Sequence, residues 1–283
     1  KYLKRKIGTI CFLVEGEGKV VQQIVKETTK EQCGDWVFLI VSSDLNGSVG
    51  SLELKETMIS KSPYFTHVIL EEEENPSFRT SYFSKMVTTA FNATKTPYLL
   101  FCDENFGPVL DNLQNLVDLL NTGNFGAIRG GIGITSEHDS KSDDSRKSKS
   151  FDAGQGVTEF GLSGTSLNGM VYNIPLLQKN MILERFEHNF RATREYPHLH
   201  LNILTAANCQ TSFYPEVLCS AQNSAQFCDE NSNYFGIKSF GKRCDQFIAL
   251  RNSLFEGFID SQKRLGREGN LNSNQFYDAY KRL

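Results

Sequence analysis

Short apolar runs alternate with longer amphipathic segments through the first half of the chain. The runs occupy residues 7–14, 36–43, 66–72, 98–104 and 125–135, and they predict strands. Between them, apolar residues recur with a period near 3.6 in segments 19–32, 51–61, 81–94 and 109–122, each long enough for a crossover helix. This alternation predicts an α/β fold with a mostly parallel, Rossmann-like sheet that helices cover on both faces.

The second half of the chain has a different pattern. Residues 136–152 are Ser-rich and carry charges of both signs, so they predict a flexible surface loop. Glycines then punctuate a strand-like stretch that ends in GMVYNI, and apolar spacing over 234–263 predicts a long helix. We therefore expect four parts: a half at 1–135, the loop at 136–152, a second half at 153–225 and a C-terminal helical segment at 226–283.

Composition excludes some classes of function. The 283 residues include 30 Lys and Arg and 33 Asp and Glu, and the net charge of −3 lacks the basic excess of nucleic-acid-binding proteins. No apolar run approaches the roughly 18 to 20 residues that span a bilayer. Seven cysteines without a C-x-x-C pair favour a reducing compartment, and we expect a cytoplasmic location.

An acidic cluster follows the apolar run at 98–102. Asp103, Glu104 and Asn105 stand where that strand gives way to a turn, and sheets of this kind bind ligands outside the carboxyl ends of their strands. Carboxylate and amide oxygens suit Mg²⁺ or Mn²⁺, and Asp103 and Asn105 alternate so that both can face one ion. The structural alternative is an ordinary acidic strand end that leads into a turn.

The segment YFSKMVTTAFNATKTPYLLFCDEN, after a strand that ends in the polar turn SSDLNGS, resembles the nucleotide-sugar half of family 2 glycosyltransferases with the GT-A fold. In that family an Asp-x-Asp motif after an apolar strand binds the metal and the donor diphosphate. The resemblance implies that Asp103 and Glu104 contact the donor and that Asp103 and Asn105 hold a divalent cation, Mn²⁺ or Mg²⁺. Asn105 replaces the second Asp, which leaves one charge fewer at the ion.

The resemblance implies that 1–135 is the nucleotide-sugar-binding half and 153–225 the acceptor-binding half, and it implies further donor contacts in the first of them. Ser43 and Asp44 end the second strand, where the family has an acidic residue that recognises the base or ribose; the alternative for Asp44 is a turn carboxylate. Lys85 matches a basic position that neutralises donor phosphate, although Arg79 competes for that role and either side chain could simply be solvated. Glu15 follows the first strand as a candidate ligand of the nucleoside.

Beyond the loop, SGTSLNGMVYNIPLLQKN and REYPHLHLNILTAA resemble a bacterial subgroup that includes abequosyltransferase-like enzymes of surface polysaccharide assembly. Its YPHL-like segment stands where many family 2 enzymes carry the catalytic base, so the resemblance implies Glu195, His198 or His200 as the base. We favour His198, because Pro197 fixes the start of a helix and would hold its first turn rigidly. The alternative is that His198 packs against or caps that helix.

The resemblance as a whole implies a GT-A-like fold and an inverting glycosyltransferase. It would move sugar from a nucleotide-sugar donor to a glycan or lipid-linked glycan acceptor in bacterial surface polysaccharide synthesis. The basic pair Lys281 and Arg282 near the C-terminus leaves peripheral contact with the inner face of the membrane as an expectation. Two alternatives stay open: a sugar nucleotidyltransferase, which the acidic FLVEGEGK segment disfavours, and a non-catalytic sugar-binding or scaffold relative, which Asn105 keeps in view.

Overall fold

A computed structural model describes residues 6–15, 18–28, 33–43, 64–70, 79–133, 148–163, 166–188, 196–221, 240–263 and 271–283. The predicted helix at 51–61 and most of the predicted loop lie outside these residues. The strands are β1 Gly8–Val14, β2 Trp36–Ser43, β3 Phe65–Leu70, β4 Tyr98–Asp103, β5 Phe106–Pro108, β6 Phe125–Gly133, β7 Lys149–Phe151, β8 Met170–Asn173 and β9 Gln210–Ala221. The helices are α1 Lys19–Glu27, α4 Arg79–Ala93, α5 Leu110–Asn121, the π-helical turn η2 Val157–Gly161, α6 Ile174–Lys179, α7 Ile182–His188, α8 Pro197–Asn208, α10 Phe240–Lys263 and α11 Ser273–Arg282.

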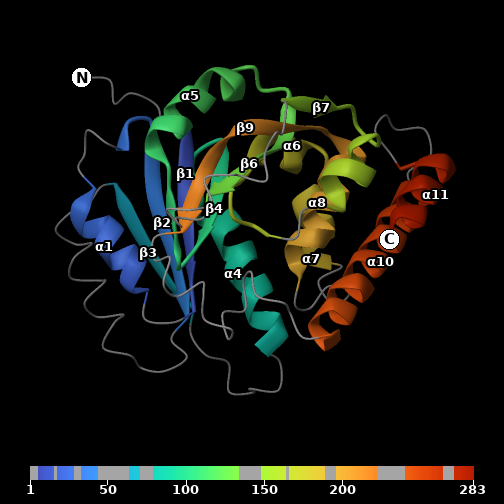
Figure 1. The fold of residues 1–283 in the computed structure, drawn as a ribbon, viewed down its shortest axis with the longest axis horizontal. Coiled ribbons are helices and arrows are strands. Elements are labelled where there is room, and N and C mark those ends of the chain that lie inside the picture. Colours follow the sequence, from blue (N-terminus) through green and yellow to red (C-terminus); the bar gives the residue numbers. More distant parts are fainter. Residues whose placement is uncertain are drawn as a thin grey trace.

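The strands form one mixed sheet (Figure 1), and the predicted α/β fold is confirmed. Its order is β3-β2-β1-β4-β8-β6-β9-β5, with β7 paired to β9. The first four strands in this order are parallel, and so are β6 and β9. Strand β8 runs antiparallel to both neighbours, β4 and β6. Its first residues therefore lie near the carboxyl end of β4 and opposite the middle of β6.

Helices cover both faces of the sheet, as the apolar strands predicted. Side chains of β1 alternate between two buried clusters: Ile10 and Phe12 belong to one and Cys11 and Leu13 to the other. Apolar residues of α1 and α5 complete the first cluster, and those of α4, α6 and α8 complete the second. Because each strand residue is buried on one side or the other, the sheet is held in register along its length.

The end of the predicted loop is a strand. Residues Lys149–Phe151 form β7, which pairs antiparallel with β9. Phe151 is buried and packs edge-on against Phe213 of β9, with ring centroids 5.6 Å apart. This one apolar side chain and the long-range pairing outweigh the polar local sequence, which is why composition alone missed the strand.

The C-terminal helical segment lies along one side of the molecule, with α10 against α8 and α11 on α10 (Figure 1). An ion pair between Arg185 of α7 and Asp260 ties α10 down, and Phe276 stacks on Phe258 at 4.4 Å. A capping box fixes the start of α11, since Asn272 and Gln275 each accept the other's backbone N–H. None of the helices within the described ranges has the length and apolar character needed to cross a membrane.

Candidate active site at the carboxyl edge of the sheet

The residues that follow β1 and β4 come together at one edge of the sheet. Leu13 of β1 lies opposite Asp103, the last residue of β4. Beyond them, the backbone N–H of Glu15 donates a hydrogen bond to Glu104 Oε2 at 3.1 Å. The structure thus brings together the candidate donor contacts Glu15, Asp103 and Glu104, as the parallel order of the strands predicted.

The Asp103 carboxylate is held in one orientation. Its Oδ1 accepts the backbone N–H of Asn105 at 2.9 Å, and its Oδ2 accepts Asn168 Nδ2 at 2.9 Å. Asn168 also accepts the backbone N–H of Asp103 through Oδ1, at 2.7 Å. Each carboxylate oxygen has a further lone pair, so these bonds position Asp103 without exhausting its capacity to bind a cation.

The Asp103 carboxyl titrates close to neutral pH. Burial raises its pKa from 3.8 to about 6, and the neighbouring Glu104 carboxylate raises it slightly. The hydrogen bonds from Asn168 and Asn105 act in the opposite direction, because they stabilise the ionised form. A cation bound beside the carboxylate would also favour ionisation.

Asn168 is a site residue that the sequence reasoning did not identify. It reaches Asp103 because Gly169 adopts a φ of 74° and turns the chain into β8. A side chain at position 169 would place its Cβ 3.2 Å from the carbonyl oxygen of Gly130, and the Gly169 N–H donates to Phe101 O at 3.3 Å. The Asn-Gly pair just before an apolar strand was the available signal, since that dipeptide is typical of tight turns.

We expect Asn168→Ala to raise the pKa of Asp103 further above 6, because the variant removes a hydrogen bond to the ionised carboxylate. It also leaves the Asp103 N–H without its acceptor, which should cost about 1 to 3 kcal/mol of unfolding free energy. Carboxyl NMR titration and denaturant unfolding measure the two effects. The matched control is Asn112→Ala in α5, which removes the hydrogen bond from the Asn112 side-chain amide to the carbonyl oxygen of Val217 in β9. An equal change in the pKa of Asp103 in this control would contradict the assignment.

Arg129 was also missed, and it stands near Asn168. It is buried in β6, opposite Met170 of β8, and its guanidinium donates to the carbonyl and hydroxyl oxygens of Ser163 just after η2. The signal in the sequence was a single charge inside the apolar run FGAIRGGIGIT, because Arg is rarely buried unless its head group is paired. Arg129 fixes the chain between η2 and β8.

The helix predicted to begin at Pro197 is confirmed as α8, and His198 lies in its first turn. The His198 ring is 5% exposed and lies edge-on to Phe83 of α4 and to Tyr196, with centroids 6.4 Å and 6.1 Å away. Helix α4 follows β3 and leads into β4, so its first turns lie at the carboxyl edge of the sheet. His198 is therefore held by aromatic rings on the side where Asp103 lies.

His200, the other histidine of this segment, is an interior residue. It is fully buried, and burial lowers its pKa to about 4, with Arg185 adding to the decrease and Asp260 opposing it. Its two ring nitrogens find no hydrogen-bond partner within the described residues. Because His200 is fully enclosed it cannot reach a substrate hydroxyl, whereas His198 is buried but keeps 5% exposure in the first turn of α8.

The remaining sequence candidates are placed in part. Lys85 is half-buried in the second turn of α4. Ser43 ends β2 and Arg79 begins α4, and for both residues the structure describes the backbone alone. Asp44 and Glu195 lie outside the described residues, so their roles stay predictions.

The acidic cluster supplies oxygen ligands of the kind that Mg²⁺ and Mn²⁺ take. Asp103, Glu104 and Asn105 offer two carboxylates and one amide in consecutive positions. Within the described ranges no three His, Cys, Asp or Glu side chains gather as a self-sufficient metal site. The cluster therefore fits a cation whose coordination is completed by ligand phosphates and water, which is common for Mg²⁺.

Comparison with known proteins shows a likeness of fold. No family model matches the chain, and no curated protein matches its sequence. Its structure is similar to S. aureus TarS, with a TM-score of 0.58 and 10% identity over 98% of this chain. TarS 1–349 in complex with UDP-GlcNAc matches with a TM-score of 0.57 and 11% identity, covering 98% of this chain and 72% of that one. The complex of TarS 1–349 with UDP matches with a TM-score of 0.55 and 9% identity, covering 97% of this chain and 90% of that one.

The chain spans 43% of the length of the longer TarS chain. At identities near 10% the likeness establishes the fold, and the expected GT-A-like architecture is confirmed. The resemblance to abequosyltransferase-like enzymes stays a prediction.

Proposed function

We propose that this chain is a glycosyltransferase that takes its sugar from a nucleoside diphosphate. The observation that carries the proposal is the Asp103 carboxylate, oriented by Asn168 and Asn105 at the carboxyl end of β4 and joined through Glu104 to the turn after β1. Ligands of open α/β sheets bind at such strand ends. Support comes from the shared fold, because TarS structures hold UDP and UDP-GlcNAc, a nucleoside diphosphate and a nucleotide sugar.

In this proposal Asp103 and Asn105 hold a divalent cation, Mn²⁺ or Mg²⁺, and Asp103 and Glu104 contact the donor diphosphate. The cation would offset the negative charge that develops on the departing diphosphate. Lys85 adds positive charge on the same side, while Glu15, Ser43 and Asp44 contact the nucleoside. The ordered carboxylate matters because a ligand fixed before binding loses little further freedom when the cation arrives.

The proposed transfer is a single displacement with inversion at the anomeric carbon. The acceptor oxygen forms the new glycosidic bond as the bond from the anomeric carbon to the diphosphate oxygen breaks, and the diphosphate leaves with the electron pair. A base must take the acceptor hydroxyl proton. His198 is our choice because imidazole titrates near neutral pH and the aromatic rings of Phe83 and Tyr196 fix its position; Glu195 is the alternative.

For the acceptor and its setting we propose a glycan or lipid-linked glycan of bacterial surface polysaccharide synthesis. Peripheral membrane contact would use the exposed side of α11, where Lys281 lies over the ring of Tyr277, which is 57% exposed. Exposed aromatic and basic side chains on one short helix are typical of segments that lie on anionic lipid surfaces.

A non-catalytic sugar-binding relative is the second candidate. The observation in its favour is that Asn105 removes one charge from the motif while both Asp103 oxygens already accept hydrogen bonds. A sugar nucleotidyltransferase is disfavoured, because the acidic residues of the segment FLVEGEGK follow β1 where that class needs a basic, glycine-rich loop, and the Glu15 backbone N–H is already bound by Glu104.

Thermal unfolding with a panel of nucleoside diphosphates and UDP-sugars, each with and without Mn²⁺, tests the proposal. We expect one diphosphate with Mn²⁺ to raise the melting temperature by several degrees, since a ligand that binds only the folded state stabilises it. The matching nucleoside monophosphate is the ligand control, and Asp111→Asn in α5 is the protein control. A flat response to the whole panel would overturn both enzyme readings. Donor binding without diphosphate release towards any acceptor would favour the sugar-binding relative.

A further inference from the structure

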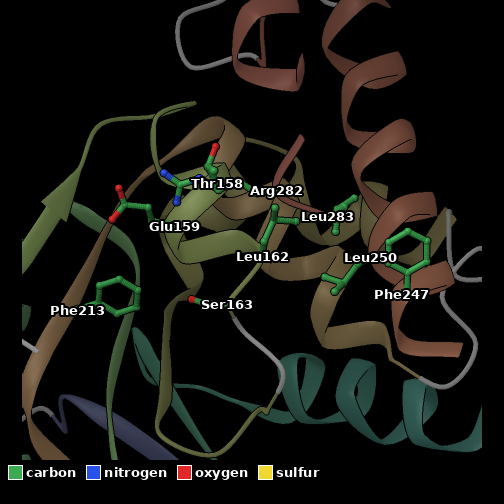
Figure 2. Close-up of a pocket in the computed structure, with 9 residues that line it drawn as sticks. All are labelled: Thr158, Glu159, Leu162, Ser163, Phe213, Phe247, Leu250, Arg282 and Leu283. Carbon is green, nitrogen blue, oxygen red and sulfur yellow. The ribbon is translucent and has the colours of Figure 1, made fainter. Parts of the chain in front are cut away.

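A cavity of about 560 Å³ lies between the η2 turn and the C-terminal helices (Figure 2). Its volume is within the range of small-molecule sites, which is about 300 to 1,000 Å³. Apart from three leucines, it is lined by Thr158, Glu159, Ser163, Phe213, Phe247 and Arg282. We call it the η2 pocket.

The chemistry of the η2 pocket suits a sugar ring. Phe213 and Phe247 lie at opposite ends of the group, and the polar ends of Thr158, Glu159 and Arg282 gather on one side (Figure 2). A hydroxyl, a carboxylate and a guanidinium all hydrogen-bond sugar hydroxyls, while aromatic rings pack against the apolar C–H face of a pyranose. Lys149 forms an ion pair with Glu159, so this edge of the pocket offers both a donor and an acceptor for ring hydroxyls. The Thr158 hydroxyl and the charged ends of Glu159 and Arg282 interrupt the apolar wall, which suits a sugar better than a lipid chain.

Register across the sheet links the η2 pocket to the candidate active site. Phe213 on β9 lies directly opposite Arg129 on β6, and Arg129 lies opposite Met170 on β8. Arg129 also holds Ser163, which lines the pocket. On the far side of Met170, the preceding turn carries Asn168, which binds Asp103.

The same register fixes how far apart the two places are. From β4 the order runs through β8 and β6 to β9, three strand spacings of roughly 4.8 Å each. The strands that carry Asp103 and Phe213 are therefore about 15 Å apart across the sheet, and the η2 pocket extends from Phe213 towards α10 and α11. A sugar bound in the pocket is too distant to be attacked or to attack, but it can belong to a longer acceptor whose end reaches the donor.

We propose that the η2 pocket is an acceptor subsite, which binds a sugar unit of an oligosaccharide at a distance from the hydroxyl that receives the transferred sugar. The inference rests on the proposed glycosyltransferase function and sharpens its acceptor to an oligosaccharide. Binding energy from such a remote unit holds the reacting end in place. The full chain should accordingly prefer tri- and tetrasaccharides to the corresponding monosaccharides.

Saturation-transfer NMR on the full chain tests this with a panel of neutral and acidic tri- and tetrasaccharides and their monosaccharides, each at about 10 mM, where even weak binding is seen. We expect at least one oligosaccharide to bind more tightly than its monosaccharide. Phe247→Ala should weaken that binding by about five- to tenfold, because it removes an aromatic wall. Arg282→Gln should weaken it too, and both side chains are exposed enough for the variants to fold.

Ile259→Ala is the matched control, since Ile259 lies on the same helix with similar exposure, 43% against 45% for Phe247, and does not line the pocket. It should leave oligosaccharide binding unchanged. The inference is overturned if no oligosaccharide of the panel binds, or if binding survives in both Phe247→Ala and Arg282→Gln. Nucleoside diphosphate binding, measured through the melting temperature, is tested separately. If the unchanged chain does not bind a diphosphate, the proposed function is overturned. If all three variants still bind the diphosphate, a loss of oligosaccharide binding is due to the η2 pocket.

Discussion

Asp103→Asn should abolish nucleoside diphosphate binding in the presence of Mn²⁺ and reduce transfer by at least about a hundredfold. The substitution removes the charge that meets the cation. It also breaks the local geometry, because both Asp103 oxygens accept hydrogen bonds and an amide can accept through only one of its two ends. Calorimetric titration with the diphosphate and Mn²⁺ measures the binding, and release of diphosphate measures transfer.

We expect Asp103→Asn to lose diphosphate binding without unfolding, since burial of the Asp103 charge is itself unfavourable. Its folded pKa of about 6 lies above the ordinary 3.8, so the folded chain holds the proton more tightly than the unfolded chain does. The contribution of Asp103 to stability is therefore fully present below about pH 4 and is lost as the pH rises to about 6. Asp103→Asn removes this pH-dependent cost but also loses a hydrogen bond, so the two effects on the melting temperature at pH 7 oppose each other. Circular dichroism of the variant at pH 7 checks that it is folded.

Donor binding should have the opposite pH dependence, because the cation needs the ionised carboxylate. We expect affinity for the diphosphate with Mn²⁺ to fall about tenfold for each pH unit below 6 in the unchanged chain. Two results would show that Asp103 is a structural carboxylate at a strand end. One is an unaltered diphosphate affinity in Asp103→Asn, and the other is a wild-type affinity that does not change between pH 5 and 7, the range that spans the Asp103 pKa of about 6.

His198→Gln should lower the rate of transfer by about a hundred- to ten-thousandfold and leave donor affinity unchanged. Glutamine approximates the size of imidazole, so the packing against Phe83 and Tyr196 is largely kept, but it cannot accept the acceptor proton. Turnover at saturating donor and acceptor measures the first effect, and diphosphate titration measures the second.

Glu195→Gln provides the companion experiment for the base. If transfer persists in His198→Gln and is lost in Glu195→Gln, the proton is taken by Glu195 and His198 only packs the start of α8. If both variants retain full turnover, the base lies elsewhere in the chain. A parallel loss of donor affinity in His198→Gln would instead indicate that the substitution disturbs the neighbouring α4.

The parts of the fold that the sequence predicted are those in which local pattern and buried environment agree. Strands β1, β2 and β4 match their apolar runs closely, and α8 begins at Pro197 as expected. Strand β7 was missed because its pairing with β9 lies some sixty residues further along the chain, and nothing in the polar sequence around Lys149 announces it. The reversed direction of β8 was equally out of reach, since strand order depends on tertiary packing.

The candidate site divides in the same way. Asp103 and Glu104 were found because a strand end is visible in one segment of sequence. Asn168 and Arg129 were not, because each acts on a residue far away in the chain: Asn168 on Asp103 and Arg129 on Ser163. Such pairs depend on how the strands are arranged, and a single sequence records only the turn and the lone buried charge that make them possible.

Strand β8 also connects the packing of the interior to the position of Asn168. Met170 and Tyr172 belong to one buried cluster and Val171 to the other, so sliding β8 by one residue would exchange large and small side chains between the two faces. The same slip would carry Asn168 off its carboxylate. Substitutions that loosen the packing around Tyr172 should therefore lower the activity at Asp103. Second substitutions near β8 that restore the thermal stability of such variants should restore their activity as well.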